Sequence, residues 1–286
     1  MLNVRIIPRL DIKGPNLVKG IHLEGLRVLG KPENFARYYY EQGADELFFQ
    51  DTVASLYDRN SLHDIITRTA REIFIPLTVG GGLRNIEDIR NVLRAGADKV
   101  AINTAAVKNP KFIEEASRIF GSSTIMVSIE AIKVSDNKYE VFTDNGREYT
   151  GIEVVAWAKR VEELGAGEII ITSVDREGTG EGFNIELLQM VSKAVSIPII
   201  AHGGANSPEN IVSAIKLGNA DAVAISSILH YAAIQSVCNF GNEYKAEGNI
   251  SFLNSGKVPK NITASSLREI RLALIGANIP TRIISK

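Results

Sequence analysis

The chain has 286 residues, with 32 Lys and Arg against 33 Asp and Glu, so its net charge is −1. This length fits one large α/β barrel or two small domains, and the charge balance provides no overall positive field that would hold a nucleic acid. The one cysteine, Cys238, excludes an intramolecular disulfide and a cysteine-rich metal site.

The N-terminal segment runs from a short apolar stretch directly into charged residues, unlike a signal peptide. No apolar stretch reaches the ~20 residues that span a bilayer. We therefore expect a cytoplasmic protein that does not enter a membrane.

Short apolar runs alternate with amphipathic stretches along the chain. The expected strands lie at 4–8, 46–51, 75–81, 99–103, 124–130, 168–173, 197–204 and 222–227. Helical patterns lie between them at 34–44, 86–97, 110–121, 153–166, 185–195 and 208–218. Continuous apolar strands separated by helices indicate a parallel sheet covered by helices. Eight such units favour a closed (β/α)₈ barrel, with an open doubly wound sheet as the alternative. A segment at 134–151 with an Asn-Gly pair predicts a hairpin after the fifth strand.

An internal repeat supports closure. The segment starting at Ile75, IPLTVGGGLRNIEDI, matches IPIIAHGGANSPENI, which starts at Ile197. The flanks match as well, because EQGADELFF has the counterpart EELGAGEIII and GADKVAINTA has the counterpart NADAVAISSI. Two half-barrels of four βα units each close naturally into eight strands. The repeat therefore predicts a TIM barrel built from two duplicated half-barrels.

Both copies of the repeat carry glycines and polar residues where strands end. These residues are Gly81, Gly82, Asn103 and Thr104 in the first half and Gly203, Gly204, Ser226 and Ser227 in the second. Glycines let backbone N–H groups approach an anion, polar side chains add donors, and helix N-termini add a favourable dipole. Active sites of such barrels form at the C-terminal ends of the strands. We therefore expect two phosphate sites facing each other across the mouth, suited to a small molecule phosphorylated at both ends.

The chain resembles the cyclase subunit family of imidazole glycerol phosphate synthase in the motifs RIIPRLDIKG, LVKG, FIPLTVGGG, IRNVLRAGADKVAIN and TSVDREGT. The resemblance covers about residues 2–230 and a C-terminal segment, SLREIRLALIGANIPTR. It implies an enzyme of histidine biosynthesis that uses ammonia from a glutaminase partner. The reaction converts phosphoribulosyl formimino aminoimidazole carboxamide ribotide into imidazole glycerol phosphate and aminoimidazole carboxamide ribotide. The isomerase barrel of the same pathway resembles the chain less closely, and no metal or cofactor is implied.

The resemblance also assigns the acid–base groups. Asp11, just past the first strand, matches the family's first catalytic carboxylate, and the second falls at Glu130, where the family has aspartate. The extra methylene of Glu130 moves the carboxylate by about an ångström, and a misplacement on that scale can cost ~100-fold in rate. Either the pocket has adapted or the reaction differs. Arg9 also departs from the family, which has a small or thiol residue there.

Further matches are expected to bind substrate. Lys19 lies in a glycine-flanked loop after the first strand, which in the family closes over substrate. Asp51 and Asp175 match polar substrate-binding groups, and Gly178 with Thr179 extends the loop that follows the sixth strand.

Four charged residues lie at the starts of strands, at the opposite end of the expected barrel: Arg5, Glu46, Lys99 and Glu168. They match the ring that gates ammonia entry in the family, and two cations with two anions can pair completely. A simple salt-bridge plug of the barrel is the alternative. With either interpretation we expect the glutaminase partner to dock at this N-terminal face.

An insert at about 231–262, rich in Asn, Gly and Ser, has no counterpart in the family. It follows the eighth strand, so it is expected on the active-site face of the one barrel formed by residues 1–286. The insert and Glu130 keep a second function open. In that alternative, the chain is a divergent duplicate that conducts ammonia to a separate enzyme amidating a surface sugar, an acetamidino modification.

Overall fold

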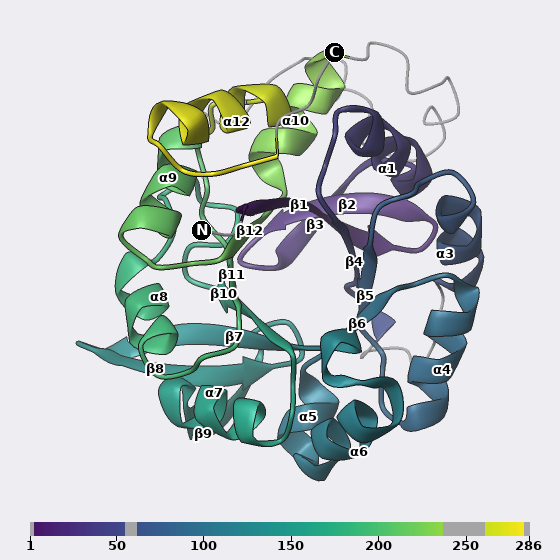
Figure 1. Ribbon diagram of the computed structural model, residues 1–286, viewed down its shortest axis with the longest axis vertical. Coiled ribbons are helices and arrows are strands. Elements are labelled where there is room, and N and C mark those ends of the chain that lie inside the picture. Colours follow the sequence, from purple (N-terminus) through teal and green to yellow (C-terminus); the bar gives the residue numbers. More distant parts are fainter. Residues whose placement is uncertain (1–2, 55–61, 237–260, 283–286) are drawn as a thin grey trace.

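A computed structural model describes residues 3–54, 62–236 and 261–282 of the chain. Eight parallel strands form a closed ring (Figure 1): β1 Arg5–Lys13, β4 Leu47–Asp51, β5 Leu77–Gly80, β6 Lys99–Ile102, β7 Ile125–Ser135, β10 Glu168–Ser173, β11 Ile199–His202 and β12 Ala222–Ile225. The ring closes where β12 pairs with β1, with Arg5 opposite Ala222. The predicted (β/α)₈ barrel is confirmed, and the open sheet is excluded.

Helices surround the ring on its outer side (Figure 1). They are α1 Pro32–Glu41, α3 His63–Ala70, α4 Ile86–Ala95, α5 Thr104–Lys108, α6 Lys111–Phe120, α7 Val154–Glu163, α8 Ile185–Ser192, α9 Pro208–Lys216, α10 Ser227–Ser236 and α12 Leu267–Gly276, with a 3₁₀ turn at Ser122–Thr124. Their ends follow local sequence signals. The Asn85 side chain accepts a hydrogen bond from the backbone N–H of Asp88 at the start of α4, and Gly96 ends this helix in the left-handed conformation.

Two antiparallel excursions interrupt the alternation of strands and helices. The first is a hairpin, β2 Asn16–Ile21 and β3 Glu24–Gly30, where the sequence predicted only a loop. The second continues β7 into β8 Lys138–Thr143 and β9 Glu148–Glu153. Asn145 and Gly146 both have positive φ between β8 and β9, which confirms the predicted Asn-Gly turn.

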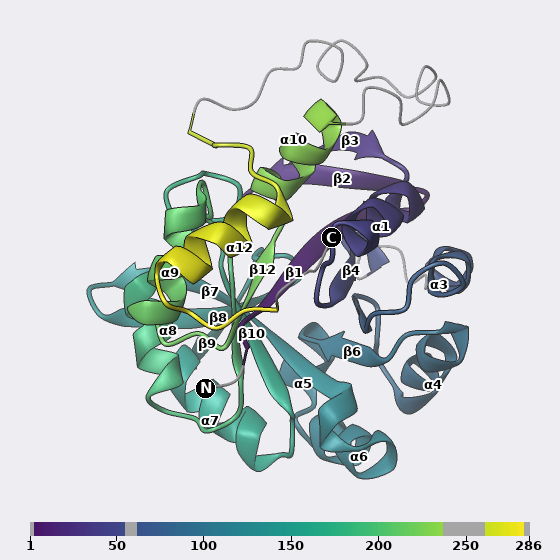
Figure 2. The same ribbon diagram turned by 45° about the horizontal axis from the view of Figure 1, so that its top comes forward.

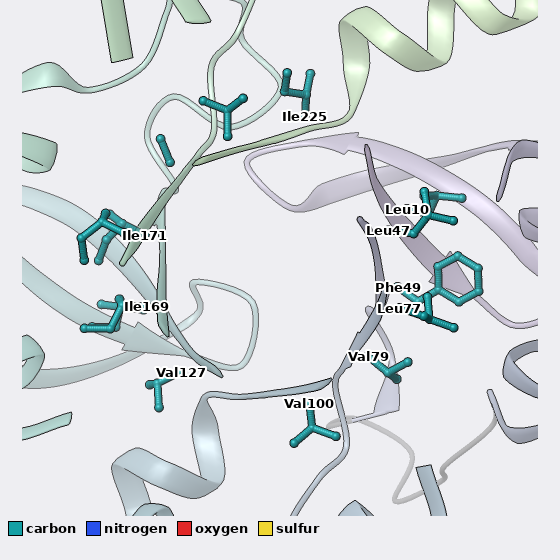
Figure 3. Close-up of a cluster of buried hydrophobic side chains, with 14 of the residues drawn as sticks. Leu10, Leu47, Phe49, Leu77, Val79, Val100, Val127, Ile169, Ile171 and Ile225 are labelled. Atoms are coloured by element: carbon teal, nitrogen blue, oxygen red, sulfur yellow. The ribbon is translucent and has the colours of Figure 1, made fainter. Parts of the chain in front are cut away.

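Successive side chains along each strand face opposite sides of the ring, so the protein has two apolar cores. One set of side chains packs between the ring and the helices, and Figure 3 shows members of this set, such as Leu10, Phe49 and Val127, around the outside of the strands. The other set fills the ring itself: Ile7, Phe48, Ala101, Met126, Ile170, Ile200, Ala222 and Ala224. Since successive strand residues face opposite sides, Arg5, Ile7, Arg9 and Asp11 of β1 share the inner side.

The last helix completes the helical layer beside the first strand. Helix α12 lies against α9 (Figure 2), and Val4 forms an isolated parallel bridge with Thr281. Residues 237–260, most of the predicted insert, lie outside the described residues. Within the described ranges, no helix is both long enough and apolar enough to cross a bilayer.

A buried aromatic cluster joins α1 to α10. The hydroxyl of Tyr39 lies 2.6 Å from Nδ1 of His230, and the two rings stack with their centroids 5.8 Å apart. Burial, with a smaller contribution from the positive charge of Lys19, lowers the pKa of His230 to about 3. The imidazole is therefore neutral in the folded chain over most of the pH range.

We expect acid to destabilise the protein through His230. The unfolded chain takes up a proton at this ring near pH 6.5, whereas the folded chain does so only near pH 3. The unfolded state thus binds the extra proton between these values, and the free energy of unfolding falls as the pH is lowered through this window. The contribution is at most about 1.4 kcal/mol per pH unit.

Denaturant titrations between pH 7 and pH 4 would measure this slope. His230→Leu should flatten it, whereas His63→Gln, at an exposed position, should leave it unchanged. Equal slopes for His230→Leu and the unmodified chain would contradict this assignment.

Candidate active site

Two cavities open at the C-terminal ends of the barrel strands. The larger has a volume of about 360 Å³ and lies at the ends of β4 to β7, where its lining includes Gln50, Arg84, Lys108, Ser128, Asp144 and Asn145. The smaller, of about 20 Å³, lies at the ends of β11 and β12. In the strand order of the ring, β5 and β6 are diametrically opposite β11 and β12. The two predicted phosphate sites therefore face each other across the mouth.

The first predicted phosphate site forms one wall of the larger cavity. Gly81 and Gly82 have positive φ there, and Asn103 and Thr104 stand where β6 leads into α5. A Cβ atom on Gly81 would lie 2.3 Å from the carbonyl oxygen of Asp51. Glycine is therefore required at position 81 by both conformation and space.

The second site repeats this arrangement at the smaller cavity. Gly203 and Gly204 have positive φ, and a Cβ atom on Gly204 would lie 2.3 Å from the carbonyl oxygen of Gly182. Ser226 and Ser227 line the same cavity, and Ser227 begins α10. The Ser226 hydroxyl donates to the Arg9 carbonyl over 2.9 Å, which ties this site to β1.

The two candidate acid–base residues project from opposite strands of the ring. Asp11 on β1 is buried and accepts a hydrogen bond from Nε of Arg9 at 3.0 Å. Glu130 on β7 is also buried and lines the larger cavity, and its Oε2 accepts a hydrogen bond from the Gly146 backbone at 2.8 Å. Burial raises the pKa of Glu130 to about 7, although the Gly146 N–H and the charge of Arg9 act in the opposite direction.

Lys19 lies on β2, within the hairpin that replaces the predicted loop. Its ammonium group is buried and forms an ion pair with Glu177, in the segment that follows β10. Burial alone would lower the pKa of Lys19, but the carboxylates of Glu177 and Asp11 more than offset it and raise the pKa above its usual value. The hairpin is further fixed because Glu177 accepts from the Leu23 backbone.

The other predicted substrate-binding residues are distributed over several surfaces. Asp51 lines the larger cavity, but its Oδ1 also accepts hydrogen bonds from the backbone of Val53 and Ala54. Asp175 lies in a separate open depression and accepts from the Lys133 backbone at 2.8 Å. Gly178 lines the smaller cavity, while the Thr179 hydroxyl donates to the Arg176 carbonyl.

The four predicted gate residues meet at the N-terminal end of the barrel. Arg5 contacts Glu46 at 3.0 Å and Glu168 at 2.6 Å. Lys99 contacts the same two carboxylates at 3.2 and 3.0 Å. The four side chains thus alternate in charge around a complete ring, with the Thr78 hydroxyl as an additional donor to Glu46.

Three polar residues of the mouth could not be selected from the sequence by pattern. His202 and Thr172 lie inside the ring and contact Arg9, and Glu177 anchors the hairpin. Glu177 stands beside Gly178 in a motif that resembles the family, and this was the one signal that could have drawn attention to it.

The closed ring of strands, with two Gly-rich cavities opposed across its mouth, defines the chain as a duplicated half-barrel of the (β/α)₈ class. A family model described as "Histidine biosynthesis protein" matches residues 5–235. The chain therefore belongs to the histidine biosynthesis protein family.

Curated relatives narrow this similarity to one subunit type. The chain is 60% identical over 204 residues to the imidazole glycerol phosphate synthase subunit HisF of Legionella pneumophila, an alignment that covers 71% of this chain and 96% of that relative. It is 49% identical over 250 residues to the HisF subunit of Methanocaldococcus jannaschii, covering 81% of this chain and 92% of the relative. A HisF subunit from Alkaliphilus metalliredigens is 47% identical over 231 residues, with the same coverage.

We expect Gly81→Ala to weaken anion binding at the larger cavity. The methyl group would collide with the Asp51 carbonyl, and positive φ adds strain of about 1–3 kcal/mol. Calorimetric titration with inorganic phosphate would measure the loss. Gly121→Ala is a matched control, because Gly121 also has positive φ but a Cβ atom there would meet nothing within 4 Å. Equal phosphate affinity in both variants would argue against a phosphate site at Gly81.

Proposed function

We propose that the chain works as the cyclase subunit of imidazole glycerol phosphate synthase in histidine biosynthesis, with Asp11 and Glu130 as its acid–base pair. Membership of the family and high identity to HisF subunits support the activity. The observation that carries the residue assignment is the pair of buried carboxylates on opposite strands, between two Gly-rich cavities.

The cyclase reaction requires proton transfers on both sides of the ring that forms. Ammonia that adds to the ketose carbonyl of the substrate must lose protons, and the aminoimidazole nitrogen that leaves must gain one. A group with a pKa of about 7, such as Glu130, exchanges protons efficiently at neutral pH. Asp11, ion-paired with Arg9, supplies a carboxylate on the opposite side of the mouth. The substrate would span the mouth with one phosphate at each Gly-rich site.

Ammonia would enter at the N-terminal end through the ring of Arg5, Glu46, Lys99 and Glu168. Because the four charges pair with one another, we infer that the ring opens when a small neutral molecule passes. A glutaminase partner docked on this face would deliver ammonia directly to it. The name shared by the relatives, a synthase subunit, agrees with an assembly of more than one chain.

We expect the purified chain to turn over the bisphosphorylated ribulosyl substrate in ammonium salt without a glutaminase. At a constant concentration of free ammonia, activity should rise with pH through about 7, since Glu130 must lose its proton to act as a base. Asp11→Asn and Glu130→Gln should each lower kcat by about 100-fold or more.

The matched control is Asp136→Asn, in the exposed turn after β7, which should retain full activity. Glu130→Asp shortens the side chain and tests whether the cavity is fitted to glutamate. Substrate binding without turnover would contradict the cyclase proposal and favour an ammonia-conducting partner in sugar amidation.

We expect Lys99→Met to reduce turnover driven by glutamine and a glutaminase more than turnover driven by ammonium salt. The substitution leaves the buried Glu46 with one cation fewer, and we expect it to lower stability by about 2 kcal/mol. The ratio of the two rates, measured with and without the glutaminase, separates an effect on ammonia transfer from an effect on the cyclase reaction itself. Lys159→Met, on the exposed side of α7, is the control. An unchanged ratio would mean that the ring has no role in ammonia transfer and only stabilises the barrel as a salt-bridge plug.

A further inference from the structure

Arg9 puts a positive charge inside the barrel, at the level of the mouth. Its side chain is 5% exposed, and its guanidinium group lies 5.3 Å from the ring centroid of Phe48, which belongs to the inner apolar core. This cation therefore lies between the apolar interior of the ring and the polar residues of the mouth. A buried guanidinium is costly unless its donors are satisfied.

Partners on three strands contact two of its nitrogen atoms, Nε and Nη1. Nε donates to Oδ1 of Asp11 at 3.0 Å, and Nη1 lies 3.5 Å from the Thr172 hydroxyl and 3.2 Å from Nδ1 of His202. Because a guanidinium can only donate, Nδ1 of His202 must be the acceptor. Burial and the charges of Arg9 and Lys19 lower the pKa of His202 well below its usual value, which keeps the ring neutral. The geometry and charge of Arg9 are thus fixed from β1, β10 and β11.

The same guanidinium lies close to the second carboxylate. Thr172 on β10 pairs in register with Glu130 on β7, so Arg9 reaches the strand position directly beside Glu130. The other charged groups around this centre are Lys19 on β2, with its partner Glu177, and Asp144 in the turn between β8 and β9. Arg9 contacts both Asp11 and a strand neighbour of Glu130, Thr172.

We propose that Arg9 is a positioning residue of this site, which holds the Asp11 carboxylate in one orientation and places a positive charge beside the strand position of Glu130. The inference rests on the proposed function for its kinetic consequence. Nε of Arg9 holds Asp11 while Nη1 contacts Thr172 and His202, and a single ammonium group would not hold these partners to the same degree. Through its charge, Arg9 favours the ionised form of Glu130 and opposes the effect of burial.

The test compares Arg9→Met, which removes the charge at similar length, with Arg9→Lys, which keeps it. The first measurement is the ¹³C NMR titration of protein labelled at the Glu side-chain carboxyl, with the Glu130 signal assigned through Glu130→Gln. In the unmodified chain this signal should titrate near pH 7. Arg9→Met should move the midpoint upward by about one pH unit, and Arg9→Lys should leave it near its original value.

The second measurement is the pH profile of turnover in ammonium salt, at a constant concentration of free ammonia. Arg9→Met should lower kcat by about 100-fold, because Asp11 is no longer held, and should move the rising limb to higher pH. KM should change little, since Arg9 does not line either cavity. Arg9→Lys should keep the position of the limb but recover only part of kcat, as expected for a charge without the planar guanidinium group.

Arg271→Met is the matched control. Arg271 is also a buried arginine, bonded to Thr281, Asp45 and the Gly43 carbonyl, but it lies on the outer side of the barrel. Its loss should lower stability without moving the Glu130 titration. The proposal is wrong if Arg9→Met leaves the titration and kcat unchanged, or changes KM alone. Because the titration needs no turnover, an inactive unmodified chain would overturn the proposed function separately from the effect of Arg9 on Glu130.

Discussion

The pairing of β12 with β1 closes the ring, and closure confines the inner side chains to one shared interior. The middle of this interior is apolar, where Ile7, Phe48 and Ile170 belong to one buried cluster. Charged residues can occupy the two ends only as satisfied groups, because an unpaired buried charge is too costly. The ion-pair ring at one end and the Arg9 cluster at the other are two solutions to the same constraint. Inner residues of β1 contribute to both ends and to the apolar layer between them, and so do Glu168, Ile170 and Thr172 of β10.

The sequence predicted the ring well because its signals are local. Apolar runs, helix caps and the repeat beginning at Ile75 and Ile197 each depend on a few neighbouring residues. The β2–β3 hairpin was predicted only as a loop, since its stability depends on Glu177, which is remote in sequence. Helix α3 was likewise not predicted.

In the candidate site, the sequence predicted the positions of the backbone glycines better than the contacts of the side chains. Gly81 and Gly204 stand where the repeat indicated, because positive φ and close backbone approach leave glycine as the usual residue. The surroundings of the Asp11 and Glu130 carboxylates depend on contacts between strands that meet only when the ring closes, so the sequence did not predict them. The Arg9 contact with His202 joins residues 193 positions apart, and no sequence pattern predicts it.

The two antiparallel excursions of the barrel reach into opposite halves of the chain. The β2–β3 hairpin, which follows the first barrel strand, is held by Glu177 after the sixth. The turn between β8 and β9, which follows the fifth strand, is held through Asn145 by the carbonyl of Thr52 after the second. Each half-barrel therefore completes the mouth of the other, in a reciprocal exchange that follows the two-fold repeat. A duplicated ancestor that acquired these contacts would have lost the option of working as a separate half, since either half alone would lack the residue that the other half supplies.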